Sequence, residues 1–475
     1  MSEITARANE DASSQKRITA GYARYVFWIM FLISFLNYLD RYVLTGGANI
    51  IAKELHFGLD GVGYISSAFL IVYTISTIPL GIWADRSKRK NVTAISVTIW
   101  SLITAVTALA NNFTTLFLTR MVLGIGEAGY FPAGTALMSD YFSRTRRSRI
   151  MGLWSSGQYV GILFGFVLGG ALAGLYPGSW RLAFLFTGIP GLILAFLAWR
   201  LREPRRNQAD EEEEALQPEV ALAIEETEPP PHAHQFSSHI FAQFGSLLRI
   251  KTMVVLIVMQ IFAFFVLGVN VTFLPIYLQQ KDTFNLTSAQ AGLFSGVVIV
   301  LAGMAGTILG GYMADWLNKR YRGARVLVCG IGFLVSAPSF ALAVTSRGLG
   351  IFTVFFVLTT FLVSIYNGPS TAATQDVVPS MLRASAVAIT LLIAHMLGDA
   401  FAPSLVGILA RNFDPTHGLH FQQGIAGNDL SRALLITCTP ALVIAGLVGI
   451  FGSRWMKQDV ENAVRIDQMA KASAS

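Results

Sequence analysis

Long apolar runs alternate with short polar segments along almost the whole chain of 475 residues. A run of about 20 mostly apolar residues is long enough to cross the hydrocarbon core of a bilayer as a helix. The pattern therefore predicts an all-α membrane protein. We predict twelve transmembrane helices, at residues 23–46, 60–83, 91–110, 113–138, 149–174, 180–200, 249–279, 287–314, 324–346, 349–375, 384–410 and 432–453.

A short motif near the end of the second apolar run returns near the end of the eighth. Gly81 and Asp85 are repeated as Gly311 and Asp315, at a constant offset of 230 residues (311 − 81). A repeat near half the chain length, in two sets of six runs, is typical of a transporter built from two parallel halves. We therefore expect two six-helix bundles related as a pseudo-repeat.

The halves are joined and flanked by polar segments. The segment between them carries many glutamates and three consecutive prolines, a composition that cannot bury a core and is expected to be disordered. The predicted divisions are an N-terminal tail (1–21), an N-terminal bundle (22–202), an acidic cytoplasmic linker (203–247), a C-terminal bundle (248–454) and a C-terminal tail (455–475).

Charge defines the predicted orientation. Only 13% of residues are charged, the net charge is +7, and most lysines and arginines fall in alternate connections between the runs. This asymmetry places both termini in the cytoplasm of a cell (inner) membrane protein. It also explains the basic character without a nucleic-acid partner. The two cysteines lie inside apolar runs and no metal-ligand spacing occurs, so we expect no metal and no cofactor.

Two full charges interrupt the fourth apolar run, at Arg120 and Glu127. One such charge in hydrocarbon costs roughly 2.5–3.5 kcal/mol on insertion scales, so it must face a protein interior or a wet cavity. Seven residues make nearly two helical turns, which places both side chains on one face. The simpler interpretation is a structural ion pair, but charges in other helices favour a polar pathway through a transporter.

The first run carries Asn37, Asp40 and Arg41. By residue count, Asp40 and Arg120 lie about 10 Å below the outer surface and Glu127 about 10 Å deeper. We therefore predict that Asp40 and Arg120 are partners. Glu127 is the first candidate for a proton carrier and Asp40 the second, because a buried carboxyl group can titrate near neutral pH.

Further candidates lie in the second half and at the membrane surface. Polar residues in the seventh, tenth and eleventh runs are predicted to line the substrate cavity with Asn37, Arg41 and Arg120; these are Asn270, Tyr366, Asn367 and His395. Acids and bases at neighbouring helix ends can form a latch of charge-assisted hydrogen bonds. The predicted cytoplasmic gate comprises Gly81, Asp85, Arg86, Arg89 and Asp315.

Two segments resemble motifs of the major facilitator superfamily: GIWADRSKRK (81–90) and LTRMVLGIGEAG (118–129). Within that superfamily, NYLDRYVLTG (37–46) with GEAGYFPAGTALMSDYF (126–142) resembles the spinster-like group, which moves lysophospholipids and sphingosine-1-phosphate-type lipids. The resemblance implies a proton-coupled lipid transporter that works by alternating access. It also implies that Asp40, Arg120 and Glu127 respond to protons and substrate.

Two other functions stay open. The anion:cation symporter group shares a similar GEAG-F-P pattern, and a symporter of small organic anions predicts two deep cations with little apolar lining. A membrane enzyme or sensor would need a catalytic group, and the nearest arrangement is His395 with Asp399, four residues apart. We expect no enzyme. The expected partners are an amphiphilic lipid or organic anion, protons and the bilayer, and we expect a monomer.

Overall fold

The computed structural model describes residues 18–216, 245, 247–416 and 418–472, which are mostly helical and contain no strand. The N-terminal bundle contains α2 (Ala20–Glu54), α3 (Leu59–Arg86), α4 (Arg89–Thr107), α5 (Phe113–Ala128), α6 (Tyr130–Tyr141), α7 (Arg144–Ala173) and α8 (Trp180–Arg200). The C-terminal bundle contains α12 (Lys251–Gln279), α13 (Ser288–Asn318), α14 (Ala324–Thr345), α15 (Leu349–Ser364), α16 (Asn367–Asp376), α17 (Arg383–Ala394), α18 (Ala402–Phe413) and α20 (Gly427–Gly452).

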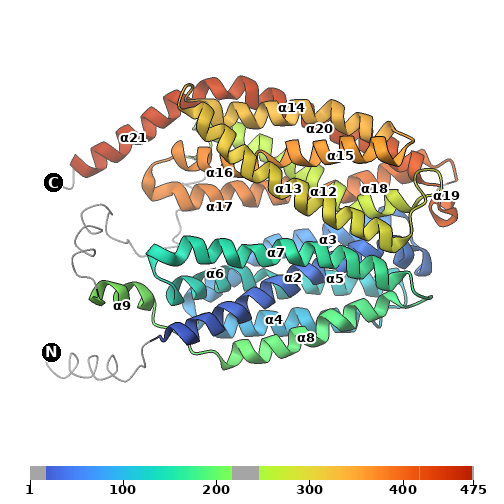
Figure 1. Ribbon diagram of the computed structural model, residues 1–475, viewed down its shortest axis with the longest axis horizontal. Coiled ribbons are helices and arrows are strands. Elements are labelled where there is room, and N and C mark those ends of the chain that lie inside the picture. Colours follow the sequence, from blue (N-terminus) through green and yellow to red (C-terminus); the bar gives the residue numbers. More distant parts are fainter. Residues whose placement is uncertain (1–17, 217–244, 246, 417, 473–475) are drawn as a thin grey trace.

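These helices form the predicted arrangement of twelve membrane spans. Ten described segments are long and apolar enough to cross a membrane, with α15–α16 and α17–α18 each counted as one segment. The α4 helix and the α5–α6 pair complete the set. In Figure 1 the two bundles lie side by side. The start of α2, α9 (Gln208–Leu216) and α21 (Met456–Ala472) lie at one end, which we call the near end, and α19 (Leu419–Gln423) lies at the opposite, far end.

Corresponding spans of the two bundles are interrupted. The fourth span breaks at Gly129 between α5 and α6, and the tenth breaks at Ile365 and Tyr366 between α15 and α16. The eleventh span contains a π-helical turn, His395–Asp399, between α17 and α18. Interrupted helices in matching positions of two repeats are a common pointer to the binding region of a transporter, and π-turns are frequent at functional sites.

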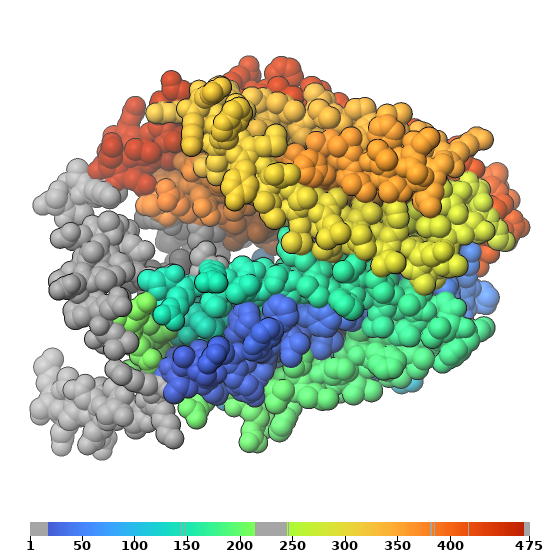
Figure 2. All heavy atoms as spheres, viewed as in Figure 1, coloured from blue at the N-terminus to red at the C-terminus, as the bar shows by residue number. Residues whose placement is uncertain are grey.

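The bundles meet along a seam that is tight toward the far end. A Cβ atom on Gly170 of α7 would lie 2.4 Å from the Ser288 carbonyl oxygen of α13, and one on Gly63 of α3 would lie 2.3 Å from the Pro403 carbonyl oxygen of α18. These glycines allow the two bundles to touch backbone to backbone. Figure 2 shows the bundles in contact toward the far end and a hollow between them toward the near end.

The start of the segment between the bundles differs from the expected disorder. Residues Gln208–Leu216 form α9, which is anchored to the N-terminal bundle. Arg147 Nη2 bonds Asp210 Oδ2 at 2.8 Å, and the Asn207 amide donates to Asp140 Oδ1 at 2.9 Å. One acid of this segment, Asp210, is therefore a partner for the basic start of α7. The expectation for residues 217–244 lies outside the described residues.

The C-terminal segment also forms a helix, α21 (Met456–Ala472), which is anchored to the C-terminal bundle. The Thr252 amide donates to Asp459 Oδ2 at 2.8 Å, and the Ser380 amide donates to Asp467 Oδ1 at 3.1 Å. Thus α9 and α21, which follow the last span of each bundle, both contact the connection between the fourth and fifth spans of their own bundle.

Candidate functional site

A buried ion pair joins the first and fourth spans. Arg41 Nη2 lies 2.6 Å from Glu127 Oε2, and Arg41 Nε bonds the same oxygen at 3.2 Å. The Glu127 side chain is fully buried, whereas the Arg41 side chain is 19% exposed. The second carboxylate oxygen of Glu127 is buried without a hydrogen-bond partner. Arg41 therefore binds Glu127 through only one of the two carboxylate oxygens.

Aromatic rings surround the Arg41 guanidinium. Its central carbon lies 5.1 Å from the ring centre of Tyr38, 5.0 Å from that of Phe69 and 4.8 Å from that of Tyr73. Cations near aromatic faces are stabilised by the ring quadrupole, more strongly where water is excluded. The charged guanidinium of Arg41 therefore lies directly beside an apolar surface formed by aromatic rings.

The Asp40 carboxylate points away from Arg41 and into the N-terminal bundle. Thr104 of α4 donates to Asp40 Oδ2, and Thr187 of α8 donates to Oδ1 at 3.3 Å. Adjacent residues on a helix point about 100° apart, so Asp40 and Arg41 of α2 reach two different sets of partners. Two hydroxyl donors partly satisfy the buried carboxylate, and the charge of Arg120 attracts it from beyond hydrogen-bond distance.

The expected pair between Asp40 and Arg120 is not formed within the described part of the chain. Arg120 is buried, with its guanidinium carbon 4.8 Å from the ring centre of Phe184 in α8, one turn from Thr187. Asp40 and Arg120 thus lie against the same helix, but Arg120 Nε and Nη2 have no hydrogen-bond partner. Asn37, predicted to bind substrate, is also buried with an unpartnered amide nitrogen.

The second-half candidates are dispersed over three spans. His395 Nδ1 lies 3.0 Å from Asp399 Oδ2 on the π-turn, and the His395 ring meets Phe264 edge to face at 4.6 Å. Asn270 is half-buried in α12. At the break in the tenth span, Tyr366 is buried against Phe333, whereas Asn367 is exposed and bonds Thr307 of α13 at 3.0 Å.

The predicted gate residues lie at the near end, but not in one latch. Asp85 and Arg86 are exposed, and Gly81 is half-buried in α3. Arg89 pairs with Asp140 at the end of α6. Asp315 lies in the other bundle, where its Oδ1 is 3.0 Å from Nη2 of Arg325.

Sequence reasoning missed the residues that complete these pairs. Arg325 also pairs with Asp376, and this pair corresponds to Arg89 with Asp140. Both members are shifted by 236 residues (325 − 89 and 376 − 140). An acid and a base repeated at one constant offset were visible in the sequence. Each of these ion pairs joins two helix ends within its own bundle.

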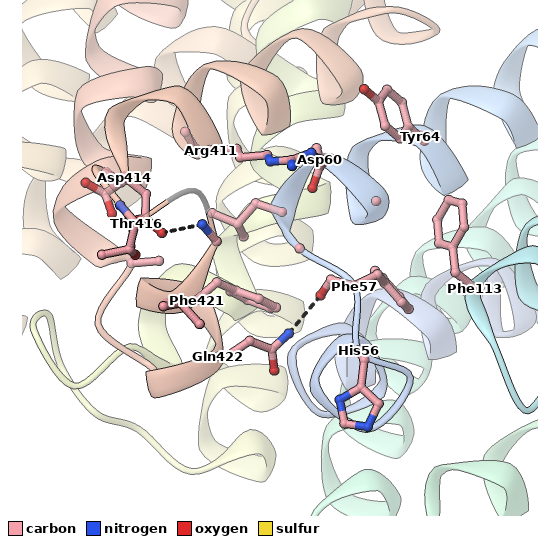
Figure 3. Close-up of a pocket in the computed structure, with 18 residues that line it drawn as sticks. His56, Phe57, Asp60, Tyr64, Phe113, Arg411, Asp414, Thr416, Phe421 and Gln422 are labelled. Carbon is pink, nitrogen blue, oxygen red and sulfur yellow. Dashed lines mark hydrogen bonds and ion pairs between the residues drawn. The ribbon is translucent and has the colours of Figure 1, made fainter.

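A cavity of about 480 Å³ lies in the seam at the far end, with walls from both bundles (Figure 3). Arg411 Nη1 of α18 lies 2.6 Å from Asp60 Oδ2 of α3, and Gln422 Nε2 donates to the Phe57 carbonyl oxygen at 3.3 Å. Deeper in the seam, Asn49 Nδ2 bonds Gln279 Oε1 at 3.1 Å. These contacts close the far end.

Comparisons with known proteins agree with this architecture. Residues 30–403 match the Major Facilitator Superfamily. The chain is 27% identical to Protein spinster of Drosophila melanogaster over 391 residues, which cover 80% of this chain and 61% of the fly protein. It is 26% identical over 405 residues to the probable L-galactonate transporter of Escherichia coli (strain K12), covering 84% of this chain and 85% of that protein. The chain thus spans less than two thirds of the fly relative.

A solved structure shares the fold. The crystal structure of a bacterial homolog to the human lysosomal transporter Spinster, in an inward-facing and unoccupied conformation, matches with a TM-score of 0.75 and 23% identity. The match covers 94% of this chain and 98% of that one. The spinster resemblance predicted from residues 37–46 and 126–142 is confirmed by these similarities. The chain belongs to the Major Facilitator Superfamily, a family of transporters, and is not an enzyme.

Proposed function

We propose that this protein is a proton-coupled transporter of lysophospholipid or sphingolipid-like amphiphiles that works by alternating access. The observation that carries the proposal is the Arg41–Glu127 pair, which couples a titratable group to a cation that can bind an anionic headgroup. The pair joins the first and fourth spans, and the fourth span is interrupted two residues beyond Glu127.

The proton step acts on Glu127. Protonation of its carboxylate removes the negative charge from the pair, so the two bonds from Arg41 weaken and the guanidinium becomes free. Protons and substrate shift the equilibrium between two conformational states when they bind one state more tightly than the other. The shift is set by that difference in affinity. Asp40 is the second candidate, because its direct hydrogen bonds come from hydroxyl groups and the nearby Arg120 forms no ion pair with it.

The substrate step uses the arginines. A guanidinium binds phosphate through two parallel hydrogen bonds, and Arg120 has two buried N–H groups without partners. The rings of Tyr38, Phe69 and Tyr73 beside Arg41 favour a ligand with an apolar part next to its charge. On this proposal Asn37, Asn270, Tyr366, Asn367 and His395 contribute polar contacts to the rest of the substrate.

The proposed orientation follows the basic connections. With both termini in the cytoplasm of the cell membrane, the near end faces the cytoplasm and the closed far end faces outward. The structure would then be inward-open. Gly81, Asp85, Arg86, Arg89 and Asp315 lie where the near end must close in the opposite state, which is the role proposed for them as a gate.

A second candidate function is symport of small organic anions. Two arginines lie in the N-terminal bundle beside its buried carboxylates, as this alternative requires, and the similarity to the probable L-galactonate transporter points the same way. Against it, Arg41 is neutralised by Glu127 and surrounded by aromatic rings. These features favour an amphiphile.

The test is substrate binding to the purified protein at pH 5 and pH 8. A lysophospholipid and a small sugar acid are compared in the wild type, in Glu127→Gln and in a matched control, Glu54→Gln, whose carboxylate pairs with Arg181. Lipid binding that depends on pH in the wild type and control, but not in Glu127→Gln, supports the proposal. Sugar-acid binding without lipid binding would replace the lipid by the organic anion. A full pH response in Glu127→Gln would transfer the proton role to Asp40.

A further inference from the structure

Three potential metal ligands converge at the far end, from three different elements. Asp414 follows α18, His420 belongs to α19, and Asp429 lies in the first turn of α20. His420 Nδ1 lies 2.9 Å from Asp429 Oδ2 and 3.4 Å from Asp414 Oδ1. The three ligand atoms all lie within 4.8 Å of one another.

We propose that Asp414, His420 and Asp429 form a binding site for a divalent transition metal, with Zn²⁺ as the best fit. Zinc accepts imidazole nitrogen and carboxylate oxygen at about 2.0–2.2 Å. Two ligands at that distance from one ion are separated by about 3 to 3.5 Å at ordinary coordination angles. The two separations from His420 Nδ1, 2.9 and 3.4 Å, are close to this range. Three protein ligands leave a position open for water.

Local charge favours a cation at this place. The Asp414 and Asp429 side chains are only 4% and 6% exposed. Burial alone would raise the pKa of Asp414, but hydrogen bonds from Thr416 and from the Gly418 and His420 amides lower it, so this carboxylate stays charged. Asp282 adds a third carboxylate, bonded to the Gly427 amide at 2.9 Å. His420 is the only base bonded to Asp414 and Asp429 in the described part of the chain. Lys53 and Lys281 lie nearby, beside Gly424 of the same loop.

Protons and metal would compete for the same nitrogen. The hydrogen bond to Asp429, with the charges of Asp414 and Asp282, raises the pKa of His420. Metal ligands must be deprotonated, so binding weakens as the pH falls through the pKa of the histidine. This competition provides a signature that separates the metal site from a simple histidine–aspartate pair.

The ion has a route to the site. Asp414 and Asp429 line the cavity of about 480 Å³ at the far end. The His420 side chain is 27% exposed. The cavity therefore connects the ligands to water and has room for a metal-bound water molecule.

The site lies between two contacts that close the far end. Arg411, three residues before Asp414, pairs with Asp60 of α3, and Gln422, two residues after His420, bonds the Phe57 carbonyl oxygen. A metal that ties α18, α19 and α20 together would hold both donors in place. We therefore expect bound metal to slow far-end opening. This inference does not depend on which substrate is transported.

The test is Zn²⁺ titration of the full-length protein by calorimetry, with Co²⁺ absorption as a second readout. His420→Gln retains a hydrogen-bonding side chain but removes the imidazole ligand. The matched control is His56→Gln, because His56 lines the same cavity but is outside the three-residue cluster. We expect one saturable Zn²⁺ site in the wild type and in His56→Gln, weaker at pH 5.5 than at pH 7.5, and its loss in His420→Gln.

Two results would overturn the proposal. One is the absence of saturable Zn²⁺ binding by the folded wild type at pH 7.5, which would leave a proton-bound histidine between two acids. The other is undiminished binding in His420→Gln. If that variant unfolds in a thermal scan, Asp429→Asn replaces it, and retained binding there counts against the site equally.

Discussion

The buried charges of α2 and α5 are only partly satisfied. Arg41 places two bonds on one oxygen of Glu127, while the other oxygen and two nitrogens of Arg120 have no partner. An incompletely satisfied buried polar network is energetically costly. Natural proteins retain such groups where they bind a ligand or exchange a proton. The unpartnered atoms therefore mark the part of the N-terminal bundle to test first.

The contact between Thr104 and Asp40 gives a stability prediction. Thr104→Val keeps the side-chain shape but removes a donor to the buried carboxylate. We expect the free energy of unfolding to fall by about 1–3 kcal/mol, the usual penalty for an unsatisfied buried group. Denaturation in detergent measures it. Thr98→Val is the control, because Thr98 bonds only the Ala94 carbonyl of its own helix; equal losses would contradict the role of Asp40.

The burial of these charges was readable from the sequence, but their pairing was not. The cost of charge in an apolar run identified Asp40, Arg41, Arg120 and Glu127 as buried. Which acid meets which base depends on the rotation of α2 about its axis, and that rotation is set by packing against neighbouring helices. The glycine contacts between α2 and α7 contribute, since a Cβ on Gly161 would lie 2.4 Å from the Phe35 carbonyl oxygen.

At the scale of helices, the spans were predictable and their interruptions were not. Apolar length fixes a span because the bilayer core has a fixed thickness. The breaks at Gly129 and Tyr366 involve one or two residues, which leaves the hydropathy pattern unchanged. The same holds for the π-turn at His395–Asp399. Helix α9 was missed because its acids find partners only after the bundle has formed.

The glycine contact between α7 and α13 gives a prediction about conformation. In Gly170→Ala the new Cβ would lie 2.4 Å from the Ser288 carbonyl oxygen, so the helices must separate. We expect more far-end opening, measured as longer spin-label distances between the far ends of α7 and α13. Gly152→Ala in the same helix is the control, because no atom lies within 4 Å of that Cβ. Unchanged distances in Gly170→Ala would show that closure does not need this contact.

The repeated near-end pairs predict unequal effects. Asp140 is only 5% exposed and Asp376 is 35% exposed. Removal of one partner from a buried pair costs about 3–5 kcal/mol, whereas exposed pairs contribute about 0–1 kcal/mol. Arg89→Gln should therefore lower the unfolding free energy more than Arg325→Gln. Thermal unfolding of both variants checks this order, and the reverse order would show that burial does not control these pairs.

At the scale of the whole molecule, the packed seam and several polar contacts between the bundles hold the far end closed. The Arg411–Asp60 pair is partly exposed and joins the two bundles directly. Asp60→Arg replaces attraction by repulsion and should open the far end, and adding Arg411→Asp should restore closure. A change of about 1 kcal/mol alters the ratio of two conformations by roughly fivefold. Labelling by a water-soluble reagent of a cysteine introduced at the far end measures that ratio. A double variant as open as the single one would exclude the charge pair as the cause.

The anchoring of α9 has a mechanical consequence. Because α9 ends at Leu216 and α12 begins at Lys251, 34 residues (217–250) connect the two helices. A chain of that length can extend to about 120 Å, several times the thickness of the bilayer core. The length of chain between the two helices therefore does not limit the travel of one bundle against the other. A cut within residues 217–244 should therefore leave two fragments that remain assembled through the seam, with their relative motion intact.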